Sequence, residues 1–229
     1  MFDFNDQLTQ IELNLDEAMG AYFVYDNIIQ KAVADEMFLQ KMNQNLYFWH
    51  SIIYSLQTTY FICMGRIFDN KSKVLSVNAF LNKCSENIQM FSKAELAKRK
   101  IDILKSDIEF QNYIDNAYEP TQEDFRFLKN IVKEYSKDYE SNYRDIRHKV
   151  FGHTEVTKKE ELERLFSNTS KIKLEEMFLV MKHIMIGLFG LYHNGHKIEF
   201  TSNILQYGFN LFTKIKEESN IVLQSMNAL

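Results

Sequence analysis

The stretch Tyr143-Arg-Asp-Ile-Arg-His-Lys-Val-Phe-Gly-His-Thr154 is the segment around which the rest of the chain is organised. It gathers two arginines, two histidines and a lysine in the last turns of an expected long helix. Gly152 is expected to end that helix, because glycine readily takes the left-handed conformation just past a helix end. The chain can then turn and bring His153 back towards Arg147. The stretch therefore predicts a helical fold in which one helix end carries the chemistry.

The composition favours an all-α fold. Seven glycines and one proline in 229 residues are few, since average usage gives roughly twice and ten times those counts. Folds rich in β-turns need these residues at many corners. Hydrophobic residues make up 45% of the chain and charged residues 25%, as in ordinary globular proteins. We therefore expect a single domain over residues 1–229, built as an antiparallel helical bundle.

Apolar residues spaced three or four apart mark the expected helices. Residues 5–34 and 35–68 are expected to pair as an antiparallel hairpin of two long helices. Ser76 can cap a short helix that reaches Cys84, and Thr121 can cap a long helix that ends at Gly152. The other expected helices are one exposed helix over 91–110, a short piece within 158–170, and closing helices over 173–191 and 203–224.

Several classes of function are disfavoured by charge and cysteine content. The formal charge of −4 gives no general attraction to nucleic acid, so a polyanion site needs a local patch. Cys63 and Cys84 lack partner spacing and are expected to be buried thiols in a reducing cytoplasm. The N-terminus lacks the pattern of a signal peptide. The most apolar window, Met177–Tyr192, is interrupted by a lysine and a histidine and is expected to be a core helix, with no membrane partner.

Arg147 and His153 are the strongest candidates for catalysis; the structural alternative is a helix-end cap and a surface histidine, because histidine near a helix C-terminus is favourable in its own right. Arginine is a permanent, forked donor to phosphate oxygens. Histidine has an unperturbed pKa suited to proton transfer near neutral pH. The pair suits RNA cleavage without metal, in which a base activates the ribose 2′-OH to attack the adjacent phosphate. No cofactor is expected, and no metal either, because His183, His193 and His196 lack companion ligands at zinc spacing.

The segment from Arg147 to His153 resembles the Arg-x(4–6)-His motif of HEPN domains, which are all-α and often act as metal-independent endoribonucleases. The wider context is most similar to the abortive-infection U group of that superfamily. A second likeness is Gly65-Arg-Ile-Phe-Asp69 at the end of the second helix. The resemblance implies a toxin or antiphage protein that cuts RNA, with an antitoxin as a possible partner. It also implies a homodimer in which two motifs face one cleft, Arg147 contacting phosphate and His153 acting as acid or base.

The sequence departs from the family pattern at two positions. The residue after the arginine is often asparagine or aspartate in HEPN domains, and here it is His148. Some HEPN toxins carry a tyrosine two residues after the histidine, which a partner nucleotidyltransferase modifies. Glu155 stands at that position here, which argues against such a partner.

Four further residues are candidates for substrate binding: Tyr143, Arg144, His148 and Lys149. Each has a structural alternative. Arg144 lies four residues after Glu140, the spacing of a helix ion pair, and Asp145 and Lys149 share that spacing. Tyr135, Tyr139 and Tyr143 form a stripe that could stack unpaired bases or belong to the core or a dimer interface. His148 could simply face solvent.

Two other functions remain open for the chain as a whole. It could be a non-catalytic HEPN module that binds nucleotide, RNA or a protein partner. It could also be a purely structural dimeric bundle.

Overall fold

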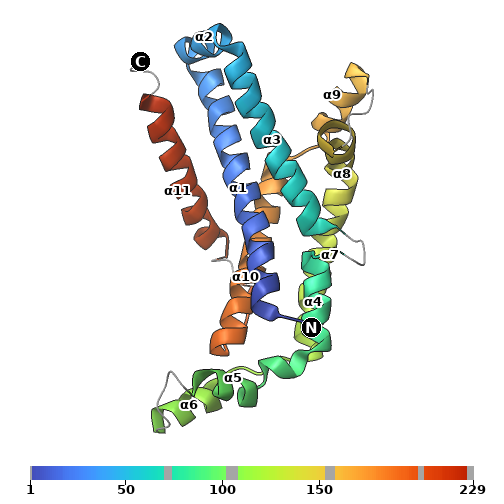
Figure 1. Ribbon diagram of the computed structural model, residues 1–229, viewed down its shortest axis with the longest axis vertical. Helices are drawn as coiled ribbons and strands as arrows, with labels where there is room; N and C mark the ends of the chain where they lie inside the picture. Colours follow the sequence, from blue (N-terminus) through green and yellow to red (C-terminus); the bar gives the residue numbers. More distant parts are fainter. Residues whose placement is uncertain (1, 70–73, 102–107, 153–157, 201–203, 226–229) are drawn as a thin grey trace.

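The structure is a computed structural model that describes residues 2–69, 74–101, 108–152, 158–200 and 204–225, with the backbone alone for 204–211. Within these ranges the chain is helical and contains no strand, which confirms the predicted all-α class. Figure 1 shows the helices as an elongated bundle. The elements are α1 (Phe4–Ala34), α2 (Glu36–Gln44), α3 (Leu46–Phe68), α4 (Val77–Glu86), η1 (Ile88–Phe91), α5 (Lys93–Lys100), α6 (Ile108–Asn116), α7 (Gln122–Asn142), α8 (Arg144–Ile146), η2 (Arg147–Gly152), α9 (Lys159–Ser167), α10 (Lys171–Asn194) and α11 (Ile204–Ser225).

The predicted N-terminal hairpin is present, with α1 and α3 antiparallel and in extensive contact (Figure 1). The prediction of one helix over 35–68 is wrong, because α2 ends at Gln44 and α3 begins at Leu46. Asn45 between them has φ −123° and ψ 47°, and its side-chain amide donates to the Lys41 carbonyl at 3.0 Å. Asparagine favours such local bonds over helix continuation, so α2 becomes a short corner between the two long helices.

Two predicted helix starts are confirmed by their caps. Ser76 Oγ accepts from the Ala79 amide at 3.3 Å at the start of α4. The Thr121 amide donates to Asp124 Oδ2 at 2.8 Å at the start of α7, as in a capping box.

The single helix expected over 91–110 is wrong. Ser92 begins a new helix, α5, by accepting from the Glu95 amide at 3.3 Å. Helix α5 ends at Lys100, and α6 then begins at Ile108. Ser92 favours a helix start because its side chain satisfies an amide that has no partner within the helix.

The main core lies where α1, α3, α7 and α10 meet. Helix α10 passes through it, with Met177, Phe178, Met181 and Ile184 fully buried, as predicted for a core helix. Cys63 and Cys84 are buried free thiols, also as predicted. Each helix in the described ranges is too short or too polar to span a lipid bilayer.

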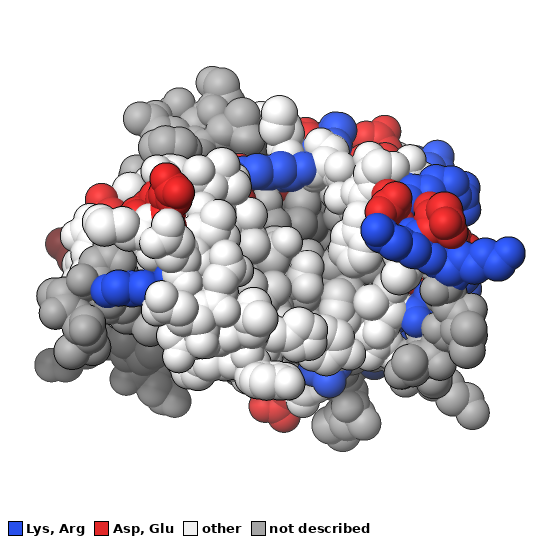
Figure 2. All heavy atoms as spheres, turned by 90° about the horizontal axis from the view of Figure 1, so that it is seen from above, with Lys and Arg blue, Asp and Glu red and all other residues white. Residues whose placement is uncertain are grey.

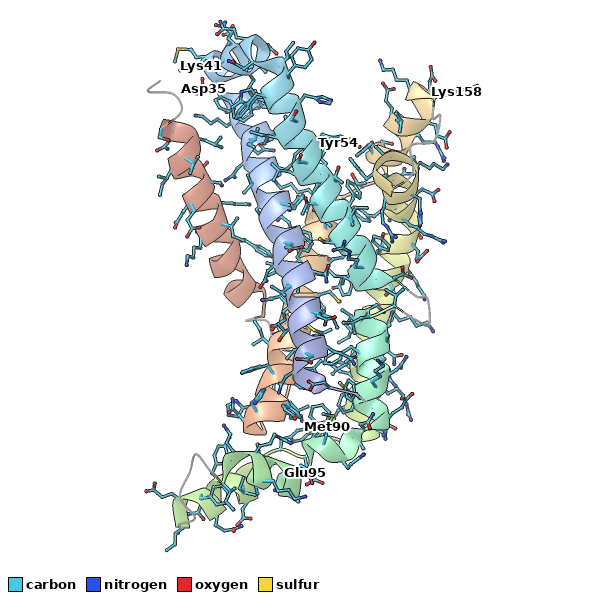
Figure 3. All side chains as sticks on the ribbon, viewed as in Figure 1. Asp35, Lys41, Tyr54, Met90, Glu95 and Lys158 are labelled. Carbon is cyan, nitrogen blue, oxygen red and sulfur yellow. The ribbon has the colours of Figure 1, made fainter. Side chains whose placement is uncertain are left out.

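A second, smaller core lies at the α2 corner. Trp49, the only tryptophan of the chain, packs against Phe38 with ring centroids 5.3 Å apart. Ile28, Met42 and Leu223 complete this cluster, so the corner joins α1, α2 and α3 to the end of α11. Figure 3 labels Asp35 and Lys41 at this corner, and Met90 and Glu95 at the opposite end of the molecule.

Candidate functional site

The expected long helix ending at Gly152 is interrupted. Helix α7 ends at Asn142, Tyr143 leaves helical geometry with φ −121°, and the single turn of α8 follows. Residues Arg147–Gly152 then form a π-helix, η2. Such wide turns are rare and are often found at functional sites. Arg147 therefore begins an irregular segment instead of continuing a regular helix.

Gly152 does not take the left-handed conformation that its sequence position predicts. Among the described residues a positive φ occurs at Gly195, at 64°. Gly152 instead closes the π-helix, where a Cβ would lie 3.0 Å from the Arg147 carbonyl oxygen. Glycine is favoured there because the backbones approach closely, which is a different reason from the one expected.

The Arg147 side chain lies against α3 at Gly65. A Cβ at Gly65 would overlap Cδ, Nε and one terminal nitrogen of Arg147. Gly65 is buried among bulky neighbours, so its missing side chain provides the space through which the arginine passes. The two segments that carried the family likeness, one in each half of the chain, thus meet in the structure.

Tyr139 is the second neighbour of Arg147. It is buried on α7, and its hydroxyl makes no hydrogen bond of normal geometry with any described residue. Burial raises the pKa of the Tyr139 hydroxyl, and the charge of the nearby Arg147 guanidinium lowers that pKa in part. Asp69, at the end of α3, is close enough to raise the same pKa. The guanidinium is therefore placed between α3 and α7, beside a neutral phenol.

Several contacts fasten η2 to its surroundings. Phe151 stacks on Phe61 of α3 with ring centroids 4.9 Å apart. Tyr54 of α3, labelled in Figure 3, also lies near Phe151, with ring centroids 5.8 Å apart. Lys149 Nζ bonds Glu161 Oε1 of α9 at 2.6 Å and lowers the pKa of that carboxyl. The π-helix is thus held by α3 on one side and α9 on the other.

The other substrate-binding candidates are placed as follows. Arg144 pairs with Glu140 at 2.8 Å, which confirms the predicted helix ion pair. The Lys149 ammonium is engaged by Glu161. His148 is half-buried and already has an interaction within the chain. Tyr143 is buried, and its hydroxyl donates to the Ser170 carbonyl at 2.9 Å.

His153 and Glu155 lie outside the described residues, so the distance between His153 and Arg147 stays a prediction. Arg66 and Asp69, which lie in the second stretch that resembles the family, have different neighbours. Arg66 donates to Asn14 of α1 at 3.2 Å, whereas Asp69 lies near Tyr139.

The remaining histidines have separate partners. His183 Nε2 bonds the Glu199 carbonyl at 2.8 Å, and His193 Nε2 bonds Asn5 Oδ1 at 2.9 Å. Burial lowers the pKa of both imidazoles. No cluster of three potential metal ligands is found in the ranges that the structure describes.

Sequence reasoning did not find the Gly65–Arg147 contact or the position of Tyr139 beside it. A signal existed for the first, because a glycine within the otherwise bulky run Phe61-Ile-Cys-Met-Gly-Arg-Ile-Phe68 indicates a close approach. It also did not find a cavity lined by Tyr22, Asp26, Tyr60 and Lys171, which come from distant parts of the chain.

The fold and this site together define a HEPN-type domain: an all-α bundle with an arginine at the start of a π-helix and a histidine six residues later in the sequence. The family model HEPN_AbiU2, described as AbiU2, matches residues 9–207, and the chain belongs to this family. It is thus a HEPN domain associated with abortive infection. No curated protein and no solved structure gives a significant match.

Proposed function

We propose that this protein is a metal-independent endoribonuclease, acting as the toxin of an abortive-infection system. Arg147 binds the non-bridging oxygens of the scissile phosphate. His153 removes the proton of the ribose 2′-OH, whose oxygen attacks phosphorus as the bond to the 5′-oxygen breaks. A proton returned to that 5′-oxygen completes the exchange. The charged transition state is stabilised by the guanidinium.

The observation that carries the proposal is the position of Arg147. Its side chain passes over Gly65 and reaches the buried Tyr139, at the start of a π-helix that His153 follows in the sequence. Arg144, one helical turn earlier, is instead exposed and committed to Glu140. A guanidinium fixed by packing is preorganised for phosphate, and preorganised donors contribute most to catalysis.

A homodimer is part of the proposal. A single chain offers one arginine and one usable histidine, and cleavage needs both an acid and a base. Two copies facing each other would supply both groups. Light scattering on the purified protein tests this directly, because a monomer has a mass of 27.2 kDa and a dimer twice that. If the measured mass at micromolar protein concentration is that of one chain, the protein is a monomer. A catalytic site formed by two chains would then be wrong.

The cleavage test uses RNA in excess chelator with wild type, Arg147→Ala and His153→Ala. Each variant is expected to lose activity about 100-fold or more, because a positioned donor or general base contributes at least that much. Arg144→Ala is the matched control, since it removes a nearby exposed arginine and only a surface ion pair. Equal residual cleavage by wild type and both site variants would show that the catalytic assignment is wrong.

The second candidate function is a non-catalytic module that binds RNA, nucleotide or a protein such as an antitoxin. The observation in its favour is charge: the chain carries −4, and α9 beside the site has both signs, with Lys159 and Glu163 3.7 Å apart. Figure 2, seen from the α2 end, shows charged side chains of both signs clustered at the side where α9 lies, with smaller groups elsewhere. Retained affinity for fluorescent RNA without any cleavage would support this candidate.

A further inference from the structure

A cavity of about 210 Å³ lies between α1, α3, the start of α8 and the start of α10. Four aromatic side chains form its inner wall, and all are buried: Tyr22, Tyr60, Phe61 and Tyr143. Gln57 and Lys171 lie at its more exposed rim. Figure 2, seen from the α2 end, shows the molecule hollowed between its two sides, one of which carries a dense cluster of charged side chains.

The size of the cavity limits what it can hold. An apolar cavity of about 150 Å³ accepts benzene, whereas pockets for whole drug-sized ligands begin at about 300 Å³. A volume of about 210 Å³ therefore suits one planar ring system and excludes a complete nucleotide. The aromatic walls favour a ligand with a flat π-face.

The charges at the cavity favour a neutral ligand that donates hydrogen bonds. Asp26 is buried in the wall, and both of its carboxylate oxygens accept from Lys171 Nζ, at 2.7 and 2.6 Å. Glu175 follows one turn later on α10, with its Oε1 buried without a hydrogen bond and 4.0 Å from the same ammonium. Two carboxylates against one ammonium leave a negative excess, which repels phosphate. A carboxylate keeps free lone pairs after binding one ammonium, so Asp26 can also accept from a ligand N–H.

The position of the cavity relates it to Arg147. Phe61 lines the cavity, and Gly65, one turn later on the same face of α3, contacts Arg147. Tyr143 lines it from the other side, and the Arg147 amide bonds the Tyr143 carbonyl at 3.0 Å, which again is one helical turn. One turn corresponds to about 6 Å along a helix axis. The cavity and the arginine are therefore neighbours on both helices.

We propose that this cavity is a base-binding subsite that holds one amino-bearing nucleobase of the RNA substrate. The base stacks on the tyrosine rings, its amino group donates to Asp26, and its sugar and phosphate stay outside the cavity, at the rim formed by Gln57 and Lys171. Cytosine, adenine and guanine meet this requirement, whereas uracil has no amino group and its ring N3–H lies between two carbonyl oxygens that the Asp26 carboxylate repels. The role of the cavity as a subsite for RNA cleavage rests on the proposed function. The binding of a base in the cavity does not depend on that function.

The first test is calorimetric titration of the full-length protein with cytidine and uridine. Cytidine is expected to bind at least about tenfold more tightly, because a hydrogen bond to a charged acceptor contributes that much or more. Asp26→Asn is expected to abolish the difference. Asp16→Asn is the matched control, because Asp16 also pairs with a lysine of α10, Lys182 at 2.7 Å, away from the cavity. Leu174→Phe, which adds volume at the cavity wall, is expected to abolish binding of both nucleosides.

Folding of each variant is checked by circular dichroism, and Leu174→Phe keeps the test valid if Asp26→Asn fails to fold. Equal binding of cytidine and uridine to wild type, or unchanged binding by both cavity variants, would overturn the proposal. Choline, a quaternary ammonium ion, tests whether the cavity prefers a cation. Stronger binding of choline than of cytidine would overturn the proposal, because it would identify a cation site. Cytidine 5′-monophosphate is expected to bind no more tightly than cytidine.

A second pair of measurements asks whether the bound base belongs to RNA or to a free nucleoside. It also tests base binding separately from the proposed RNA cleavage. Oligocytidine RNA is expected to compete with cytidine, and failure to compete would identify a free nucleoside as the ligand and overturn the subsite. Arg147→Ala is expected to lose cleavage and keep cytidine binding. Cleavage without nucleoside binding by wild type contradicts the cavity proposal alone. Nucleoside binding without cleavage contradicts the proposed function and leaves base binding standing.

Discussion

Two helix ends in this chain carry the same dipeptide, Gly-His, and have different geometries. At Gly195-His196 the glycine has φ 64°, and its amide bonds the Leu191 carbonyl at 3.1 Å, as in an ordinary left-handed cap. At Gly152-His153 the glycine closes a π-helix without a positive φ. The first end simply terminates a core helix. The second widens the helix beside an arginine that is packed against another helix, and a widened turn of this kind is where chemistry is expected.

The largest effect should come from replacing the two histidines that follow these glycines. His153→Ala is expected to reduce RNA cleavage by about 10² to 10⁴, because it removes the proposed acid or base. His196→Ala is expected to leave cleavage within about twofold, since His196 is exposed at the other end of the molecule. Initial rates on one labelled RNA measure both. Similar losses in the two variants would mean that the two ends do not differ in function.

The next effect concerns stability. Gly195→Ala is expected to destabilise the protein by about 2 kcal/mol or more, because alanine is strained at positive φ and overpacks neighbours. Its Cβ would lie 2.6 Å from that of Ala117. Gly152→Ala is expected to destabilise the protein by a smaller amount, about 1 kcal/mol, because φ is not positive and the added Cβ meets only the Arg147 carbonyl oxygen, at 3.0 Å. Urea titrations give both values, and the reverse order would contradict the geometry described for the two ends.

Gly65→Ala tests the contact that distinguishes the π-helical end. The added methyl group displaces the Arg147 side chain, so cleavage is expected to fall about tenfold while the fold is kept. Gly20→Ala is the matched control on α1, where a Cβ would meet nothing within 4 Å. That variant is expected to gain up to about 1 kcal/mol in stability. If Gly65→Ala unfolds at the wild-type temperature and cleaves at the wild-type rate, Arg147 does not act from this position.

The smallest effect is a pH dependence at the Gly195 end. Burial, with the charges of Arg99 and Lys100, lowers the pKa of His193 below 6.5. Below that pH the unfolded chain binds more protons than the folded one, so this histidine makes stability decrease as pH falls from 7 towards 5. His193→Gln should therefore lose less stability than wild type between pH 7.5 and pH 5.5, by a small amount because the site is partly exposed. Denaturant titrations at the two pH values measure the difference, and an equal or larger loss in the variant would contradict it.

The sequence predicts what depends on neighbouring residues. The caps at Ser76 and Thr121 are local hydrogen bonds, and both helix starts occur where they were expected. The break at Asn45 was missed because helix continuation and a side-chain bond to Lys41 differ little in free energy. Gly152 was misjudged because a glycine permits both a left-handed cap and a close backbone approach, and sequence does not distinguish them.

The candidate site was predicted only in part, for a related reason. The family motif located Arg147, but its contact with Gly65 joins residues far apart in the chain and depends on how α3 packs against η2. The cavity is a clearer case, because the Asp26–Lys171 bond spans 145 residues and no local pattern indicates it. The sequence alone identified Arg147 as a candidate, but it did not predict which residues surround its guanidinium.

The small core around Trp49 has a consequence for how unfolding is observed. Because this is the only tryptophan of the chain, fluorescence excited selectively at tryptophan reports on the α2 corner and the end of α11 and not on the main core. Circular dichroism, by contrast, averages over all helices. Melting of the corner before the bundle would therefore appear as a fluorescence midpoint below the dichroism midpoint, and two-state analysis of either signal would require the two to coincide.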